Sequence, residues 1–420
     1  MPDKASFFRD PVHGFIEVYD SEELILNTKA FQRLRRIRQL ALTNYVYHGA
    51  EHTRFGHSLG VMHCANRIFE SVFRNSSEAL QAIGGRYERT RHLLRLFALL
   101  HDTGHGPFSH ASDEFFPKGT SHESMSARIV RETEIGHLIN EHYASLEITA
   151  DQLADLIIPS DPDPWSIFIR TIMNSDVDAD KMDYLLRDSL YCGVSYGKFD
   201  VERLVQSYTA YYDPEAGWKL GIKAGGLQAL ESFILARYWM FVQVYFNAKR
   251  RFWDLALQNF VKDSGSILQL DPLSAYLAND DNWLWHRIDE AAYAAAAGKE
   301  WAEAIVNRTH WADVDCFAEA QVSDADMVRF KYVQREVNRL FPEVIFDFPK
   351  KAPHKFHRAD DEENQVAIIF EGKPRGVESL SDIVKGLSQP IRTVRAYMPY
   401  GKREAVRESI RKEWAYGEGD

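Results

Sequence analysis

Cysteine is nearly absent from the chain: Cys64, Cys192 and Cys316 are the only three among 420 residues, and no two of them form a CxxC pair. This scarcity disfavours a disulfide framework or a thiolate zinc site, and it favours a reducing compartment. No segment provides the run of about 18 apolar residues that a membrane span requires. The N-terminus also lacks the basic start and apolar stretch of a signal peptide. We therefore expect a soluble, cytoplasmic protein with no membrane partner.

Positive charge is not in excess either. The net charge of −11 argues weakly against indiscriminate binding to polyanions, although it is compatible with a local basic groove. Apolar residues make up 45% of the chain and aromatic residues 13%, which is ample for a packed core. Because 420 residues exceed one ordinary core, we expect two lobes or one enlarged domain with an appendage.

Histidine, in contrast, is concentrated in one part of the chain. Nine of the 16 histidines lie between His48 and His122, a window of 75 residues. Scattered histidines are usually ordinary surface or core residues. A cluster this dense favours metal or phosphate chemistry about as much as it favours the ordinary explanation.

The spacing of apolar residues predicts a mainly helical chain as far as residue 342. Short extended pieces with a turn at Asp10-Pro11 are expected over the first 26 residues, and a hairpin turning at DPEAG is expected within 208–224. Helices are expected over residues 29–40 (with a basic face), 59–73, 91–100, 122–143, 151–157, 165–190, 227–262 and 273–340, the last containing AAYAAAA as a strong helix former.

The character of the sequence changes after Phe341-Pro342. The strings VIFDF and QVAIIF are rich in β-forming residues, and a helix, a strand and a charged helix follow them. The predicted fold class is therefore mainly α. It consists of a helical body at 1–342 (core 29–262) and a small α+β lobe with a charged tail at 343–420.

The string LLHDTGHGPFSH carries the strongest chemical signal. His101 and Asp102 end a very apolar helix, where an unpaired ionised carboxylate would be strongly penalised and a divalent cation would remove the penalty. An HD dipeptide alone is a weak signal. His57 before it and Asp180 after it, each on its own helix, make the signal more specific. Two imidazoles and two carboxylates suit Fe, Mn, Zn or Co better than Mg alone.

The segment around Asp180 has a polar helical face. Asp180, Lys181, Tyr184 and Asp188 fall within one arc of about 100°, beside a core-facing arc formed by Met182, Leu185 and Leu186. A solvated face is the ordinary explanation, and the upstream HD pair favours a site instead. Arg237 and Tyr245 share a face with Phe241 in the same way, for which the ordinary explanation is core packing with a snorkelling arginine.

At these residues the sequence resembles the HD-domain deoxynucleoside triphosphate triphosphohydrolases. The match covers roughly residues 8–250 and rests on DPVHGFIEV, FQRLRRIRQL, HTRFGHSLGV, LLHDTGHGPFSHA, HES, DVDADKMDYLLRDS and, more loosely, RYWMFVQVYF. From about residue 343 onward only the order of elements is similar.

The resemblance implies a role for each matching residue. The catalytic metal would be bound by His57, His101, Asp102 and Asp180. The cleft at the α-phosphate would be lined by His105, His110, Asp113 and His122, with His110 as general acid and Asp113 orienting it. His122 and Glu123 match the family's next His-Glu step, and His122 would contact phosphate or a second metal such as Mg.

The remaining roles concern the substrate. Arg54, Lys181 and Arg237 would neutralise the phosphates, and Tyr184 would pack beside them. Gln39 and Asp188 would hold the sugar 3′-hydroxyl. Tyr245 would lie under the 2′ carbon and exclude a ribonucleotide. The implied products are a nucleoside and inorganic triphosphate.

Three positions depart from the family's pattern. Asn27 stands where an aspartate reads guanine in a regulatory site, and Ser6 stands where a basic residue is expected, although Gln32 and Arg35 match. Asn247 replaces a histidine. Control by a guanine nucleotide is therefore not expected.

Two other functions use the same residues. A phosphodiesterase or nuclease acting on single-stranded nucleic acid would need the same metal set, and the basic residues of 350–358 and the arginines of 33–38 favour it. The acidic total disfavours it. A non-catalytic nucleotide sensor would be marked by loss of a metal ligand, and all four are present. The family habit and the aromatic helices predict a homo-oligomer.

Overall fold

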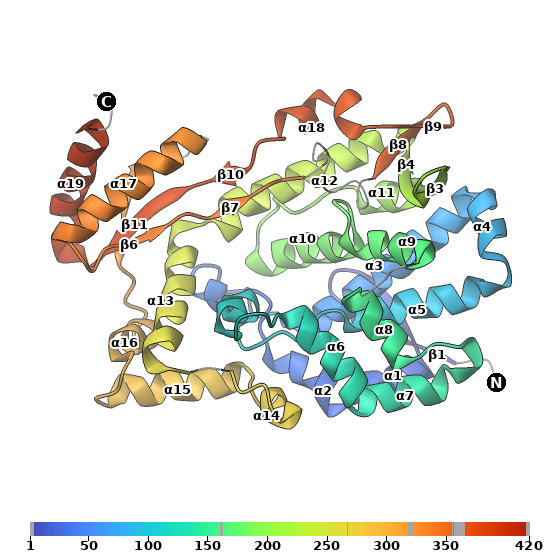
Figure 1. The fold of residues 1–420 in the computed structure, drawn as a ribbon, viewed down its shortest axis with the longest axis horizontal. Coiled ribbons are helices and arrows are strands. Elements are labelled where there is room, and N and C mark those ends of the chain that lie inside the picture. Colours follow the sequence, from blue (N-terminus) through green and yellow to red (C-terminus); the bar gives the residue numbers. More distant parts are fainter. Residues whose placement is uncertain are drawn as a thin grey trace.

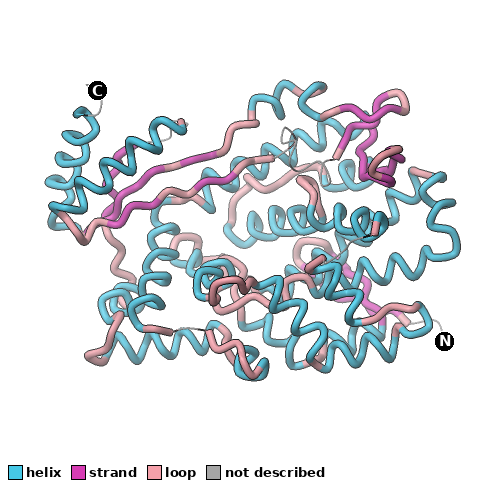
Figure 2. Tube along the Cα trace, in the orientation of Figure 1, coloured by secondary structure: helices cyan, strands magenta, loops and turns pink. Residues whose placement is uncertain are grey.

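The computed structural model describes residues 4–159, 163–266, 268–317, 323–354, 356 and 366–416. It has a mainly helical body and a small α+β C-terminal region, which confirms the predicted fold class (Figure 1, Figure 2). The two chain ends lie at opposite ends of the molecule in this view. Within the described ranges, no helix combines the length and apolar character needed to cross a membrane.

The chain begins with an antiparallel hairpin, β1 (Ala5–Asp10) and β2 (Gly14–Tyr19). At its turn, a carboxylate oxygen of Asp10 accepts hydrogen bonds from the next two free amides. The extended pieces expected up to residue 26 end earlier, because α1 (Asp20–Leu26) is helical. Glu22 caps this helix and forms a buried ion pair with Arg95 at 2.6 Å, which fixes α1 against the body.

The helix expected over residues 29–40 is much shorter. Helix α2 (Lys29–Gln32) passes into a 3₁₀ turn (Arg33–Arg36), after which the chain is extended and Arg38 pairs with Thr53. The expected basic face is also not uniformly solvated. Arg33 is buried, and its guanidinium donates to the Asn279 carbonyl at 2.7 Å, so tertiary contacts override the local helical pattern.

Three helices form the centre of the body: α3 (Arg54–Asn75), α5 (Tyr87–Leu100) and α10 (Ala179–Cys192), with α3 against both others. Helix α3 begins five residues before the predicted start, and His57 lies in its first turn. The segments 122–143 and 165–190 are each interrupted. The surrounding helices are α4 (Ser77–Ile83), α6 (His122–Glu132), α7 (Glu134–His142), α8 (Ala150–Ile157), α9 (Pro164–Asn174) and α11 (Val201–Ser207).

The hairpin expected at 208–224 is confirmed as β3 (Tyr208–Asp213) and β4 (Gly217–Lys223). The prediction of one continuous helix over residues 227–262 is wrong. Helix α12 (Leu227–Met240) leads into a π-helical turn (Phe241–Tyr245), and α13 (Ala248–Ser264) starts anew. Asn247 makes the break, since its side-chain oxygen accepts the amides of Lys249 and Arg250 at the start of α13.

The segment 273–340 is only partly helical. Its helices are α14 (Leu273–Leu277), α15 (Asp281–Tyr293), α16 (Lys299–Val306) and α17 (Asp324–Leu340), with strand β5 (Ala312–Phe317) among them. Helix α15 ends at Tyr293, so the last four alanines of AAYAAAA are not helical. The strand β5 was not expected, because its pairing partner lies about 80 residues further along the chain.

The C-terminal region divides between two places. Strands β5, β11 (Val394–Met398) and β6 (Ile345–Asp347) form one sheet beside α17 and α19 (Arg403–Tyr416), around a small second core that includes Val333 and Val337. Strand β8 (Ala367–Phe370) instead pairs in parallel with β4, followed by β9 (Lys373–Arg375) and α18 (Asp382–Gly386). Short strands β7 (Lys350–Lys351) and β10 (Ile391–Arg392) connect the two parts.

The domain boundary predicted at residue 342 stays a prediction. Residues 355 and 357–358 of the basic stretch and the tail from 417 lie outside the described residues.

Candidate functional site

Four side chains from three helices meet at the centre of the body. His57 lies in the first turn of α3, His101 and Asp102 follow α5, and Asp180 lies in the first turn of α10. One ligand atom from each lies within 4.8 Å of the others. The Nε2 atom of His57 is 3.0 Å from Asp180 Oδ1, and that of His101 is 3.4 Å from Asp102 Oδ1. We call these four residues the first cluster.

A hydrogen bond at Nδ1 orients each imidazole of the first cluster. The Nδ1 atom of His101 donates to the Ala98 carbonyl at 2.8 Å, and that of His57 donates to Asp183 Oδ2 at 2.8 Å. Each ring therefore directs Nε2 to the centre, as metal-binding histidines do. The Nε2 atom of His101 is buried and has no hydrogen-bond partner among the described residues. An unpaired buried nitrogen beside two carboxylates fits a divalent transition metal.

The carboxylate behind His57 was missed by the sequence analysis. Asp183 accepts from His13 Nε2 at 2.7 Å and from two nitrogens of Arg187 at 2.9 Å, and Arg187 also binds Asp10. A Cβ at Gly60 would lie only 1.8 Å from Asp183 Oδ1, so the helices can approach here only with glycine at that position. Its position between the two arcs of α10, with an arginine four residues further along the chain, was the signal available in the sequence.

Charge in the first cluster follows from this packing. Burial alone would raise the pKa of Asp102, but His101 and Arg54 lower it well below its usual range. Asp180 is shifted in the same direction by His101 and His57 against its burial, so its pKa is also lowered. Burial lowers the pKa of His57, and hydrogen bonds with Asp102 and other carboxylates raise it well above normal. The carboxylates are therefore ionised at neutral pH.

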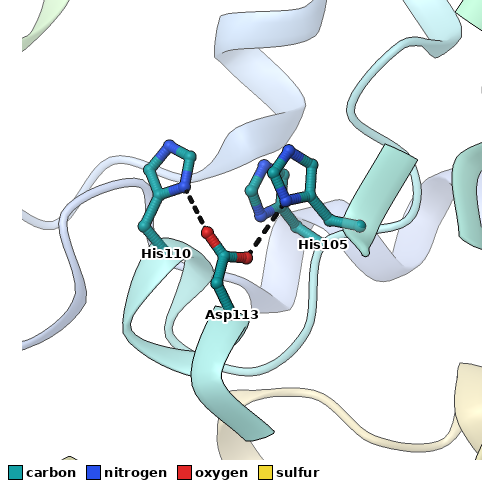
Figure 3. Close-up of side chains that lie close together, drawn as sticks. His105, His110 and Asp113 are labelled. Carbon is teal, nitrogen blue, oxygen red and sulfur yellow. Dashed lines mark hydrogen bonds and ion pairs between the residues drawn. The ribbon is translucent and has the colours of Figure 1, made fainter. Parts of the chain in front are cut away.

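A second cluster lies beside the first one. It consists of His105, His110, Asp113 and His122, whose ligand atoms also lie within 4.8 Å of one another (Figure 3). The two oxygens of Asp113 bind His110 Nδ1 at 2.8 Å and His122 Nδ1 at 3.1 Å. The ring of His105 stacks on that of His122 at 3.9 Å. The pairing expected between His110 and Asp113 is thus present in the structure.

The second cluster is more open than the first. The side chain of His110 is 68% exposed, whereas that of His105 is buried and 3.4 Å from Asp102. Burial and Arg54 lower the pKa of His105 well below normal, while Asp113 raises that of His122 against its burial. The nearby Glu123 lies 3.3 Å from His122. Within the stacked pair, these pKa shifts favour a neutral His105 and a protonated His122.

The three cationic side chains predicted to bind phosphate differ in their hydrogen-bond partners. Arg54 is buried and bonded to Asp102 and Ser109, and Lys181 is bonded to Asp178. Arg237 is also buried. Its Nη1 atom lies 3.7 Å from Asp176 Oδ1, but Nε and Nη1 donate no hydrogen bond among the described residues. Arg237 is thus the cation with the most unused donors.

The residues expected at the sugar also lie together. Tyr245 donates to Asp188 Oδ2 at 2.6 Å, and Asp188 Oδ1 binds His52 Nε2 at 2.8 Å. The rings of Tyr184 and Tyr245 are 6.3 Å apart, and the Oε1 atom of Gln39 is buried without a partner among the described residues. His52 was not singled out in the sequence.

Three residues named for the regulatory site have local partners. Asn27 ends α1, Gln32 donates to the Leu26 carbonyl at 2.8 Å, and Arg35 donates to the Gln32 side chain at 2.9 Å. Arg35 also lines a cavity of about 520 Å³ beside the β1–β2 hairpin. Ser6 lies in β1.

Comparison with known proteins matches two family models to the chain. One is described as HD domain and covers residues 54–188, and the other is described as HD associated region and covers residues 199–414. The uncharacterised protein YwfO of Bacillus subtilis is 30% identical over 92% of this chain and 90% of its own length. A crystal structure of a hypothetical protein from Aquifex aeolicus is similar with a TM-score of 0.80 and 29% identity, covering 97% of this chain and 100% of that one.

A third relative is named for an enzymatic activity. It is the deoxynucleoside triphosphate triphosphohydrolase SAMHD1 homolog of Dictyostelium discoideum, 34% identical over 48% of this chain. The matched part spans 39% of that protein's length.

Proposed function

The chain belongs to the HD phosphohydrolase family, and within it we propose that the protein hydrolyses deoxynucleoside triphosphates to a deoxynucleoside and inorganic triphosphate. The observation that carries this proposal is the convergence of the first cluster, with one buried, unpaired imidazole nitrogen, next to the exposed His110–Asp113 pair. The relative from Dictyostelium supplies the substrate class.

The first cluster would hold one divalent ion, with Fe, Mn, Zn and Co as the candidates that suit its donors. Such an ion polarises a phosphate oxygen and lowers the pKa of water. Asp183 and Ala98 would keep the two imidazoles in the right tautomer and orientation. A second ion, Mg²⁺, would reach the site with the substrate, because Mg²⁺ prefers oxygen ligands and usually binds through phosphates.

The second cluster would handle the proton. A water oxygen forms a bond to the α-phosphorus and gives up a proton to solvent. The bond from that phosphorus to the 5′ oxygen breaks, and the 5′ oxygen takes up a proton to become the 5′-hydroxyl. His110 is exposed and held through Nδ1 by Asp113, which leaves Nε2 to carry that proton as the general acid. His122, which lies next to Glu123 and whose raised pKa favours the protonated ring, would contact a phosphate.

The other side chains would bind the substrate. Arg237, whose Nε and Nη1 donate no hydrogen bond among the described residues, would bind a phosphate. Arg54 and Lys181 would add positive charge, and Tyr184 would pack beside the phosphates. Gln39 and Asp188 would hold the 3′-hydroxyl. Tyr245, tied to Asp188, would leave no room for a 2′-hydroxyl.

A phosphodiesterase or nuclease acting on single-stranded nucleic acid is the alternative function. The arginine run gives it little support, because Arg33 is buried, Arg36 pairs with Asp280 and Arg38 pairs with Glu51. These cations are engaged within the chain. We therefore place nucleic acid second to nucleotides as a partner.

We also propose a homo-oligomer. Phe7 and Phe15 stand on one face of the β1–β2 hairpin and are 64% and 58% exposed. Large exposed aromatics on a strand pair are typical of an interface. Sedimentation of the wild-type protein and of a Phe7→Ser variant tests it, and a monomeric wild type would contradict it.

The function is tested by product analysis. The purified protein is incubated with each dNTP, the matching ribonucleotides and short single-stranded oligonucleotides, in the presence of Mn²⁺, Co²⁺ or Mg²⁺. We expect deoxynucleoside plus tripolyphosphate, with ¹⁸O from labelled water in the tripolyphosphate. Shortened oligonucleotides with intact dNTPs would favour the alternative, and no product in any arm would refute hydrolysis.

A further inference from the structure

The loop of residues 102–113 carries Asp102 and three of the four residues of the second cluster. Much of it is irregular, and its geometry is strained at one point. Phe108 and Ser109 both have positive φ angles, 58° and 59°. Residues other than glycine rarely adopt this conformation, and when they do, surrounding contacts must impose it. The strained residues directly precede His110.

The contact that fixes this point comes from a distant part of the chain. The side chain of Asp281, in the first turn of α15, is buried between two segments. Its Oδ1 accepts the Phe108 amide at 2.6 Å, and its Oδ2 accepts the Arg38 amide at 2.9 Å. One carboxylate therefore links the loop to the extended segment that follows α2.

The same part of the chain holds the loop at two further points. The hydroxyl of Tyr276 donates to the Gly104 carbonyl at 2.5 Å, and the ring of Trp285 meets that of Phe108 edge-on at 5.9 Å. A Cβ at Gly104 would lie 2.2 Å from the carbonyl oxygen of His122, so the loop lies directly on the start of α6. This packing places His105 against His122.

An ordinary explanation for Asp281 is helix stability, because acidic residues favour the first turn of a helix. The capping role in α15 already belongs to Asp280, whose side chain accepts the Trp283 amide at 3.2 Å. Burial also raises the pKa of Asp281 to about 7, against the lowering effect of the two amides, so keeping this carboxylate ionised costs stability. Helix stability alone does not account for a carboxylate whose two oxygens are both bound to other segments.

We propose that Asp281 is a positioning residue, which sets the conformation of the 102–113 loop so that His110 and Asp113 face the first cluster. It lies within the part of the chain matched by the HD associated region, outside the HD match. That region would thus complete the site from a distance. The catalytic consequence rests on the proposed function, whereas the effect on the loop does not.

The test uses Asp281→Asn, which keeps the size of the side chain but replaces one acceptor oxygen by a donor group. Hydrogen exchange is followed at pH 8, where the native carboxylate is ionised. We expect exchange to rise about 10-fold or more at Phe108 or Arg38, with the rest of the body unchanged. Metal content should stay at the wild-type value, and kcat should fall by up to about 100-fold with little change in KM.

Asp280→Ser is the matched control at the same helix end. Serine still caps α15, while the ion pair with Arg36 is lost, so loop exchange and kcat should stay at wild-type values. A uniform rise in exchange throughout the protein in Asp281→Asn, or no rise at either amide, would overturn the positioning role.

Two outcomes separate this inference from the proposed function. If the wild type hydrolyses no phosphate ester, the proposed function fails, and the exchange comparison still decides the role of Asp281. If Asp281→Asn does not fold, Tyr276→Phe takes its place, because it removes only the hydroxyl that binds Gly104. Faster exchange confined to the loop near residue 104 would then support the role of this segment, and wild-type exchange would count against it.

Discussion

The two clusters contain the same kinds of side chain and are held in different ways. In the first, the Nδ1 atoms of His57 and His101 each donate to an acceptor behind the ring, so that their Nε2 atoms point inward. In the second, His110 and His122 are held by Asp113, and the loop that carries His110 and Asp113 is bound by residues of α14 and α15. Fixed donors suit an ion, which needs constant geometry. A partly exposed imidazole suits proton transfer.

The largest effect should come from removing a ligand of the first cluster. Asp180→Ala takes away the carboxylate that lies 3.0 Å from His57. Metal content should fall to background, and turnover should fall by at least about 1,000-fold, since the ion supplies most of the charge stabilisation. Elemental analysis and product assays measure both. Asp155→Asn, at an exposed surface ion pair, is the control. Normal activity in Asp180→Ala would refute the cluster.

A variant of the second cluster should separate the two roles. His110→Gln removes the proposed acid but none of the residues of the first cluster. We expect kcat to fall by about 100- to 10,000-fold while the metal is retained. A substrate with a more acidic leaving group should recover part of the rate. Loss of the metal in this variant would show that the two clusters act as one.

A smaller loss of metal affinity is expected from substituting Asp183, which binds the ligand His57 and is not itself a ligand. Asp183→Asn weakens the hydrogen bond that orients His57, so metal affinity should fall by about 10- to 100-fold. Asp10→Asn, which reaches Asp183 only through Arg187, should have a smaller effect. Competition with a chelator measures both affinities. Equal affinities in wild type and Asp183→Asn would contradict the orienting role.

The smallest effect concerns pH. Asp113 raises the pKa of His122 above the ordinary histidine value of 6.5. The protonated imidazole therefore persists at pH values above 6.5, and it loses its proton only as the pH rises through the raised pKa. In Asp113→Asn the pKa should drop, so the alkaline limb of kcat/KM should move to lower pH. The pH profile of Glu123→Gln, which keeps Asp113, should shift less. A limb that does not move in Asp113→Asn would show that His122 does not set it.

The first cluster could be predicted because its signals are local. His101 and Asp102 stand at the end of an apolar helix, and the positions of His57 and Asp180 complete a recognisable spacing. The helical arc of α10 also placed Asp180 near Asp188 and Tyr184. All four predicted ligands meet in space, although their role as ligands is still a proposal.

The rest depended on contacts between distant segments. Asp183 fell between the polar and the core-facing arcs of α10 and was passed over, since only the fold shows that His13 and Arg187 surround it. Helix α2 stops where Arg33 turns inward to Asn279, and Asp281 reaches the loop across 173 residues. Periodicity within one segment does not contain this information.

Metal reconstitution tests the central claim most directly. The protein is stripped of metal with a chelator, and Mn²⁺ or Co²⁺ is returned in steps while bound metal and tripolyphosphate from dGTP are measured together. We predict that activity returns in proportion to the first tightly bound ion and levels off near one per chain, with neither binding nor activity in Asp180→Ala. Hydrolysis that survives stripping, or tight binding that survives in Asp180→Ala, would contradict the account.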